Sequence, residues 1–305
     1  MRLMRTLISA ALAASCLASP AVRANPVEEK NVLSGKEKLD PAKGYILVSG
    51  PARQLGMFLR VPDDATRNDW QNDRLKAFEK AKRRYASNYT SWQVLVAAAK
   101  HSETAAPPAP VEPTLETTQV EPLELRDMVS FGPQFVYAKG ETITYMQSVK
   151  PGTYIWYGNV MGGAGLPAAG TCLCMGTVRF EVKPGVVTDL GNWLQAAPHW
   201  TEDLDVVRLQ AKEAAEKRAA EGKEPRTAMV NDTVRFGLPA SLKDWPSVQA
   251  EFHAHPKVNN LLGVFISRIG PVPGVIGYRR DAIVDLRSGQ ELASPTMLSR
   301  AKIKK

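Results

Sequence analysis

The chain has 305 residues, 44% of them hydrophobic, and its 39 Lys and Arg residues against 31 Asp and Glu give a formal net charge of +8. This length can bury a substantial core and has room for two domains. The basic excess is mild and forms no single evident face, so it indicates solubility and weak attraction to anionic envelope polymers. The export signal described next argues against a nucleic-acid partner.

The first 24 residues have the pattern of a signal peptide. Arg2 and Arg5 precede a short apolar run from Thr6 to Ala14, and a small-residue cleavage site ends at Ala24. The apolar run is shorter than the about 20 residues that a spanning helix needs, so no transmembrane span is predicted. We therefore expect a periplasmic or secreted protein.

A second processing route is encoded in the same segment. Leu12–Cys16 resembles the lipobox of bacterial lipoproteins, in which the cysteine is acylated, although Ala13 stands where leucine is usual. Simple export is favoured, and a membrane-anchored lipoprotein through Cys16 is the alternative. Removal of the leader with its three arginines lowers the net charge from +8 to +5.

Two strands and a helix start are predicted after a polar segment at residues 27–42. Gly44–Gly50 and Leu55–Val61 are apolar runs bounded by turn residues and predict strands. A turn at Pro62–Thr66 leads into the helix. The residues able to cap that helix are Asp64, Thr66 and Asn68.

A long helix is predicted from apolar residues at steps of three and four: Leu75, Phe78, Ala81, Tyr85, Tyr89, Trp92 and Val96. Its other face is basic, with Lys76, Lys80, Lys82, Arg83 and Arg84. We expect this helix to pack on the sheet with the basic face in solvent; the alternative is a helix lying on a membrane surface. The Pro-rich stretch 104–122 cannot build a strand ladder and predicts an extended linker, so residues 66–103 form a helical insertion.

The strongest strand signal comes next in the chain. Thr142–Val149 and Thr153–Val160 alternate apolar and polar residues and flank Pro151-Gly152. This pattern is typical of strand–turn–strand units. A two-residue loop would place Val149 opposite Tyr154.

A second unit of the same kind follows. Thr177–Lys183 and Val186–Leu190 flank Pro184-Gly185. A bulge in the turn would place Phe180 opposite Leu190 and avoid burying a carboxylate against the ring. The alternation gives one wet and one dry face, as in a half-solvated antiparallel sheet.

The carboxy-terminal third alternates helix and strand signals. Glu202–Gly222 has acids early and bases late, which suits a helix dipole. Thr227–Phe236 predicts a strand, and Leu261–Ile269 with Val275–Leu286 predicts a strand–turn–strand unit.

These elements predict an α+β, mainly β fold: an antiparallel β-sandwich with a long helical insertion and a carboxy-terminal α+β lobe. The predicted parts are a signal peptide at 1–24, the sandwich at 25–195, a connecting helix at 196–226 and the lobe at 227–305.

Cys172 and Cys174 are the first candidate site. In a regular strand their Cα atoms would lie about 6.6–6.8 Å apart, at the limit for a disulfide, so a bridge requires a turn there. Unbridged thiols on one face could instead bind a soft ion such as copper, with Met175 beside them. A structural bridge or buried thiols are favoured over metal or redox use.

His253 and His255, with Glu251, form the second candidate site. Alternate residues share a strand face, so the pair could hold a divalent ion such as zinc. Two histidines alone make a weak site, and Pro256 directly after them indicates a loop end. An incidental pair is favoured, and no cofactor is otherwise implied.

No catalytic motif accompanies these residues: the sequence has no Gly-x-Ser-x-Gly elbow and no His-Glu-x-x-His. Pro151–Tyr154, Cys172–Phe180, Pro184–Gly191 and Pro273–Tyr278 resemble segments of uncharacterised exported proteobacterial proteins. The first and third segments are also similar to small envelope β-sandwich lipoproteins of unknown function. The resemblance implies a sandwich in the envelope and brings no known activity.

We therefore expect an exported cell-envelope protein that serves as a non-catalytic interaction or scaffold module, with an envelope protein or polysaccharide as partner. The alternatives are a periplasmic metal or thiol-redox protein that uses Cys172 and Cys174, and a secreted hydrolase.

Overall fold

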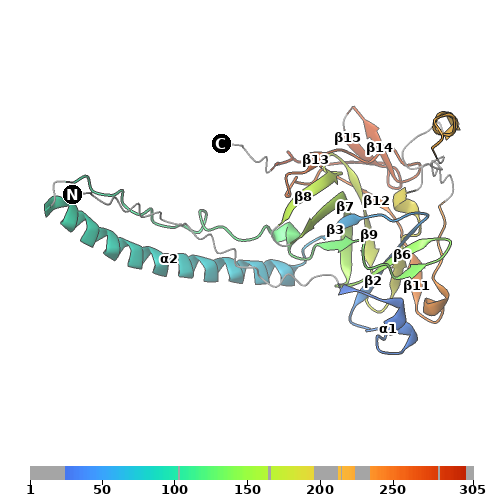
Figure 1. The fold of residues 1–305 in the computed structure, drawn as a ribbon, viewed down its shortest axis with the longest axis horizontal. Helices are drawn as coiled ribbons and strands as arrows, with labels where there is room; N and C mark the ends of the chain where they lie inside the picture. The colour runs from blue at the N-terminus through green and yellow to red at the C-terminus, as the bar shows by residue number, and fades with distance from the viewer. Residues whose placement is uncertain are drawn as a thin grey trace.

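The computed structural model describes residues 25–101, 104–163, 166–195, 212–213, 215–223, 234–280 and 282–299. The chain forms a β-rich body from which a long helical arm projects (Figure 1). The predicted leader, with Cys16, and the predicted strand up to residue 233 lie outside the described residues. Of the predicted helix at 202–222, residues 212–213 and 215–220 are described and are helical.

The body contains two larger sheets and one small sheet. The first sheet has the order β1 (Asn25–Pro26), β6 (Ile143–Val149), β2 (Gly44–Gly50), β10 (Val187–Asp189) and β11 (Ser247–Gln249), and β5 (Ala138–Lys139) also pairs with β6. The second has the order β12 (His253–His255), β9 (Thr177–Val182), β7 (Gly152–Gly163), β3 (Gly56–Arg60) and β4 (Val129–Phe131), with β8 (Leu166–Cys172) on β7 and β13 (Phe265–Ile266) on β8. The small sheet contains β14 (Ile276–Arg279), β15 (Ala282–Asp285) and β16 (Gln290–Leu292).

The core lies where the two larger sheets share apolar side chains. Ile46 of β2 belongs to the same buried cluster as Trp156 of β7 and Phe180 of β9. The opposite face of β2 is also covered, since Tyr45 and Leu47 pack with α1 (Glu29–Leu33) and η4 (Ala240–Leu242) nearby. All seven residues of β2 are therefore buried.

The sandwich prediction is confirmed, with one refinement of strand direction. Most pairs are antiparallel, but β10 runs parallel to β2 and β11, and β13 runs parallel to β8. The predicted wet and dry faces of β9 are confirmed at Arg179 and Glu181, which are exposed, and at Val178, Phe180 and Val182, which are buried; Thr177, placed on the wet face, is buried.

Both Pro-Gly links are corners between sheets, and the predicted hairpins are wrong. β6 belongs to the first sheet and β7 to the second, and the chain crosses back between β9 and β10. Val149 pairs with Gly44 and Tyr154 with Phe180. Alternation shows which face of a strand is apolar. It does not distinguish a hairpin from a corner between sheets, because in both arrangements the apolar faces of the two strands point toward the same core. Accordingly Val149, Tyr154, Phe180 and Leu190 all lie in the same buried cluster.

The carboxy-terminal region is woven into this sandwich. It supplies β11 to the first sheet and β12 and β13 to the second, and Ile276 and Ile283 of the small sheet join the central core. The boundary predicted at residue 227 therefore does not separate the strands of the two sheets. Antiparallel links in this region join β14 to β15 and β15 to β16, and no strand pairing of β13 with β14 occurs among the described residues.

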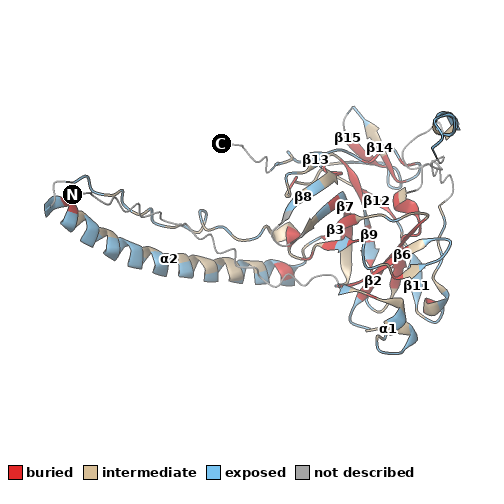
Figure 2. Ribbon diagram, in the orientation of Figure 1, coloured by how far each residue is buried: buried red, intermediate tan, exposed pale blue. Residues whose placement is uncertain are grey.

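The arm is the α-helix α2 (Asp64–His101), 38 residues and therefore about 57 Å long. Its only buried residues are Thr66 and Ala99 (Figure 2). The expected packing of this helix on the sheet is wrong, because α2 leaves the body and approaches it near η1 (Leu123–Leu125) at its base. The chain after α2 runs back along the helix, and we call residues 104–122 the return segment (Figure 1).

Candidate functional site

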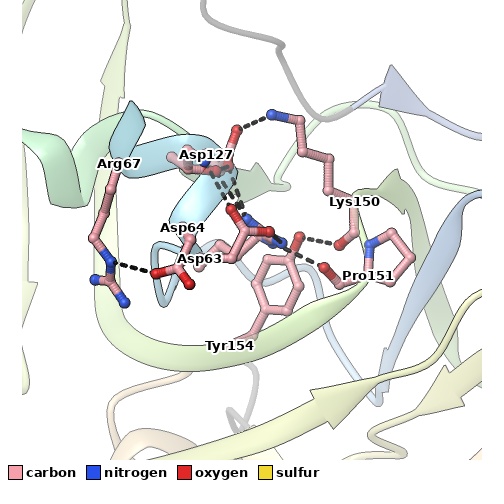
Figure 3. A network of polar contacts seen from close by, with 9 residues as sticks. Asp63, Asp64, Arg67, Asp127, Lys150, Pro151 and Tyr154 are labelled. Carbon is pink, nitrogen blue, oxygen red and sulfur yellow. Dashed lines mark hydrogen bonds and ion pairs between the residues drawn. The ribbon is translucent and has the colours of Figure 1, made fainter. Parts of the chain in front are cut away.

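The arm joins the body at a buried arginine. Arg60 ends β3, its side chain is 6% exposed, and its Nε donates a 2.8 Å hydrogen bond to the Pro151 carbonyl at a sandwich corner. Its Nη2 lies 2.5 Å from Asp63 Oδ2 at the start of the helix, and its Nη1 lies 3.2 Å from Asp127 Oδ2 just after the return segment. One guanidinium thus ties together the corner and both ends of the arm. Figure 3 shows Asp63, Asp127 and Pro151 gathered at this point.

Asp127 completes this attachment from the other side. Its Oδ1 accepts a 2.9 Å hydrogen bond from Lys150 Nζ, and its Oδ2 also accepts one from the Thr66 hydroxyl at 3.2 Å. The Tyr154 hydroxyl donates to the Lys150 carbonyl at 2.6 Å. Two cations therefore hold one buried carboxylate, which satisfies the requirement that buried charge be paired and hydrogen-bonded.

The glycine of the first Pro-Gly corner makes room for Arg60. Gly152 has φ of +138°, and a Cβ on it would lie 2.9 Å from Arg60 Nε. A larger residue would therefore push the guanidinium away from the Pro151 carbonyl. The glycine of this Pro-Gly corner is therefore required by the close approach of Arg60, which attaches the arm to the body.

The charges of this cluster shift the pKa values of its members. Burial lowers the pKa of Arg60, but the hydrogen bond and charge of Asp63, together with the charge of Asp127, outweigh it and leave that pKa raised. The hydrogen bond from Arg60 holds the pKa of Asp63 far below its usual range. Burial raises the pKa of Tyr154 well above its usual value. All three groups keep one charge state across physiological pH.

Asp63 also caps the helix. Its Oδ1 accepts a 2.8 Å hydrogen bond from the backbone N–H of Thr66, which is the geometry of an N-cap residue. Sequence reasoning named Asp64, Thr66 and Asn68 as caps and missed Asp63, one position earlier.

The return segment covers one side of α2. Trp92 Nε1 donates to the Pro107 carbonyl at 2.8 Å, Arg74 donates to the Leu115 carbonyl at 3.0 Å, and Trp70 Nε1 donates to the Glu121 carbonyl at 2.8 Å. Arg126 and Asp73 form an ion pair at the base of the arm. The helix and the return segment thus run in opposite directions with their contacts in register.

Between Pro107 and Pro113 the exposure of the return segment follows a repeat of three. Pro107, Pro110 and Pro113 are half-buried, while the residues between them are exposed. A polyproline II helix has three residues per turn, so every third residue faces the same side. The apolar stripe of α2 faces this segment, since Phe78, Ala81, Tyr85, Trp92 and Val96 are its half-buried members. The predicted stripe is therefore confirmed at five of its seven positions, Leu75 and Tyr89 being exposed, and its partner is the predicted linker.

The opposite side of α2 is basic and open to solvent. From Lys80 to His101 the helix has five Lys and Arg residues and no acid. The cations clustered midway along the helix are Lys76, Lys80, Lys82, Arg83 and Arg84, and all are exposed, although Lys82 lies over the Phe78 ring at the edge of the apolar stripe. This arrangement can attract anions along the arm.

A small pocket lies beside the attachment of the arm. Its volume is about 130 Å³, and its lining includes Lys43, Asp127, Lys150 and Tyr154. Ligand pockets typically measure about 300–1,000 Å³, so this one suits water or a small ion better than an organic substrate.

Cys172 and Cys174 form a disulfide with their Cα atoms 5.2 Å apart. The chain leaves β8 at Cys172 and turns directly afterwards, which brings the Cα atoms closer than a regular strand would allow. Both cysteines are fully buried. The bridged form offers no thiolate to copper, with or without Met175.

The two histidines of β12 do not converge on a site. His253 lies 3.7 Å from Asp285 and 3.8 Å from Glu251, and Arg287 binds Glu251 at 3.2 Å. Burial, helped by the charge of Arg179, lowers the pKa of His255 to about 4. No group of three or more His, Cys, Asp or Glu that could hold a metal ion occurs among the described residues.

Sequence reasoning missed Arg60 and Asp127, which are 67 positions apart. The available signal was weak: a lone arginine ends an apolar strand three residues before a helix-capping aspartate. Within the described part of the chain, no helix combines the length and apolar character needed to cross a bilayer. Comparisons of the sequence with protein-family models and curated proteins, and of the structure with solved structures, find no match.

Proposed function

We propose that the protein is an exported cell-envelope protein that acts as a non-catalytic interaction or scaffold module, with the arm as its contact element. The observation that carries this proposal is the arm itself. A 38-residue helix, braced by its return segment, holds a long exposed surface away from the body. Because almost none of that surface enters the core, it contributes little to the stability of the body and suits contact with another component.

Two features support export. The leader pattern at Met1–Ala24 is typical of a signal peptide. The disulfide between Cys172 and Cys174 supports a compartment outside the cytoplasm, because disulfides persist in oxidising environments.

A non-catalytic role is supported by the pairing of the charged side chains in the polar clusters. Arg60 and Asp127 bind each other and the ends of the arm, and Arg287 occupies Glu251 beside His253. The disulfide is fully buried, so a redox partner would have to open the structure to reach its sulfur atoms. The pocket of about 130 Å³ has room for little more than water.

Photo-crosslinking in cells that make the full chain tests the role of the arm. A photoreactive phenylalanine analogue at Ser87 or Ser91, both exposed on α2, should give a discrete adduct with an envelope component, lipid or protein. The same analogue at Ser288, exposed on the body, is the matched control and should give none. Adducts from the body alone would contradict the proposal.

Intact mass of the protein from membrane and soluble fractions tests the export step. A mature chain that starts at Asn25 is expected, and acylated Cys16 at the terminus would establish the anchored form instead. A chain that retains Met1–Ala24 would contradict export by this signal.

A further inference from the structure

One face of α2 carries cations in its middle and aliphatic residues toward its far end. Arg74 and Trp92, which bind the return segment, are 18 residues apart, and five turns of helix bring them to the same side. Lys76 and Val94 each come two residues later, about 200° around the helix, and so lie nearly opposite the return segment. We call this face the outer stripe; its members, at steps of three and four, are Lys76, Lys80, Arg83, Ser87, Ser91 and Val94. Arg84 and Leu95 lie at the margin of the stripe, about 60–80° further around the helix.

The cations of this region are largely free of acids. Lys76 lies 3.8 Å from Asp73 and Lys82 lies 3.8 Å from Glu79. Among the described residues, no acid pairs with Lys80, Arg83 or Arg84, which stand within five consecutive positions. The acids of the return segment lie across the helix, so they do not neutralise this charge.

Two exposed aliphatic side chains lie toward the far end of the helix, one on the stripe and one at its margin. Val94 is 65% exposed, and Leu95 beside it is 56% exposed. The inner face of the helix already has the return segment as a partner, so these two residues are not needed to hold the arm together. Val94 comes ten residues after Arg84, about 15 Å further along the helix, so the arm has a positive middle and an exposed aliphatic pair nearer its far end.

From this geometry we propose that the outer stripe of the arm binds the surface of an anionic lipid bilayer. This inference rests on the proposed contact role of the arm and names its partner. Anionic headgroups attract Lys80, Arg83 and Arg84, while Val94 and Leu95 enter the boundary between headgroups and acyl chains. A purely polar polyanion would account for the cations and leave the aliphatic pair without a role.

The shape of the arm lets the middle of its outer side reach a flat surface first. The helix is bowed, and the return segment runs along its concave side (Figure 1). The outer stripe lies nearly opposite that segment, so it follows the convex side, and a convex rod touches a plane first near its middle. Lys80, Arg83 and Arg84 lie in that middle part of α2.

Vesicle flotation with the full mature chain tests the proposal. Vesicles of equal parts phosphatidylglycerol and phosphatidylcholine should carry the protein, and vesicles of phosphatidylcholine alone should not. Replacing Lys80, Arg83 and Arg84 by alanine should weaken binding about a hundredfold, since each cation near an anionic surface contributes about a factor of five. Alanine is the best helix former, so these changes keep the helix, and circular dichroism verifies it.

Two further variants separate the stripe from general charge. Replacing Lys36, Lys139 and Lys243, exposed cations of the body without an ion-pair partner among the described residues, by alanine removes the same charge and should leave binding within about twofold. Replacing Val94 and Leu95 by alanine should weaken binding at least about tenfold, even at about 1 M salt, where the Debye length is about 3 Å.

The outcomes that overturn the proposal are distinct. Equal loss of binding in the stripe and body variants would show that net charge alone causes the binding, and this would overturn the proposal. Binding of soluble polyglutamate by the arm without binding of vesicles would assign the stripe to an acidic peptide instead. If vesicles do not bind while Ser87 and Ser91 still crosslink in cells, the lipid inference fails and the contact role of the arm stands.

Discussion

The strand β2 and the helix α2 use their residues in opposite ways. All seven residues of β2 are buried, whereas only Thr66 and Ala99 are buried among the 38 residues of α2. The body is therefore stabilised by apolar burial in its sheets, on both sides at β2 and on one side at β9. The arm is stabilised by its cap, by its hydrogen bonds to the return segment and by one polar attachment to the body.

This difference separates stability from contact with other molecules. Changes in the body should act on the free energy of unfolding, and changes in the arm should act on the surface that the protein presents. Arg60 contacts both regions, so a change at this residue should alter both the free energy of unfolding and the position of the arm. The following predictions test that separation.

The largest effect is expected from a matched pair of tryptophans. Trp156→Ala removes a side chain that is 1% exposed in the core and should lower the free energy of unfolding by about 3–5 kcal/mol. Trp92→Ala, half-buried on the arm, should cost less than about 1 kcal/mol in the same measurement. Urea unfolding followed by far-ultraviolet circular dichroism measures both, and equal costs would contradict the separation.

Arg60→Ala should lower the free energy of unfolding by about 3 kcal/mol and loosen the arm. Removing one partner of a buried ion pair costs about 3–5 kcal/mol, and Lys150 remains on Asp127 to keep the loss near the lower end. Hydrogen exchange should rise at residues 64–70 and 123–128.

Arg67→Ala is the control for that attachment. Arg67 makes an exposed ion pair with Asp64, so its loss should cost less than about 0.5 kcal/mol and leave exchange unchanged. Unchanged exchange in the Arg60 variant would show that the arm is held elsewhere.

His255 should make the body sensitive to mild acid. Its pKa is lowered to about 4 in the folded protein, against about 6.5 in the unfolded chain. Between these values the unfolded chain binds a proton that the folded protein does not, so stability should fall as the pH falls from about 6.5 toward 4. The expected loss is about 2 kcal/mol, allowing for partial exposure of the ring. His255→Gln should flatten this dependence in urea unfolding, and a slope equal to that of the wild type would contradict the assignment.

Apart from the control variants, the smallest effect is expected from the disulfide. Reduction of Cys172–Cys174 should cost about 1.5 kcal/mol, because closing so short a loop removes little entropy from the unfolded chain. Unfolding with and without reductant measures the cost. Crosslinking through Ser87 should be unaffected, and its loss on reduction would favour the thiol-redox alternative.

The alternation of Val178, Phe180 and Val182 was sufficient to predict strands and a buried face, and the steps from Leu75 to Val96 were sufficient to predict the helix. Neither pattern identifies a neighbour. Alternation is the same whether β6 and β7 pair or face each other across the core, so hairpins were predicted where corners occur. A stripe on a helix shows that something covers it, and the cover was the return segment.

The attachment of the arm could not be predicted for a related reason. Arg60, Asp127 and Pro151 meet only when three distant segments are folded together. Buried ion pairs leave no periodic trace in a sequence, unlike apolar faces. The sequence shows the cations of the arm directly. That several of them have no acid partner follows only from the positions of the surrounding side chains in the structure.

The bowed helix also makes the protein a lever. Both ends of the arm converge on Arg60, so a sideways load at the far end turns about that point with a moment arm of about 57 Å. The torque arrives at the Pro151 carbonyl and so at the corner between the two sheets. Movement of a molecule bound at the far end of the arm would therefore transmit force to one edge of the sandwich.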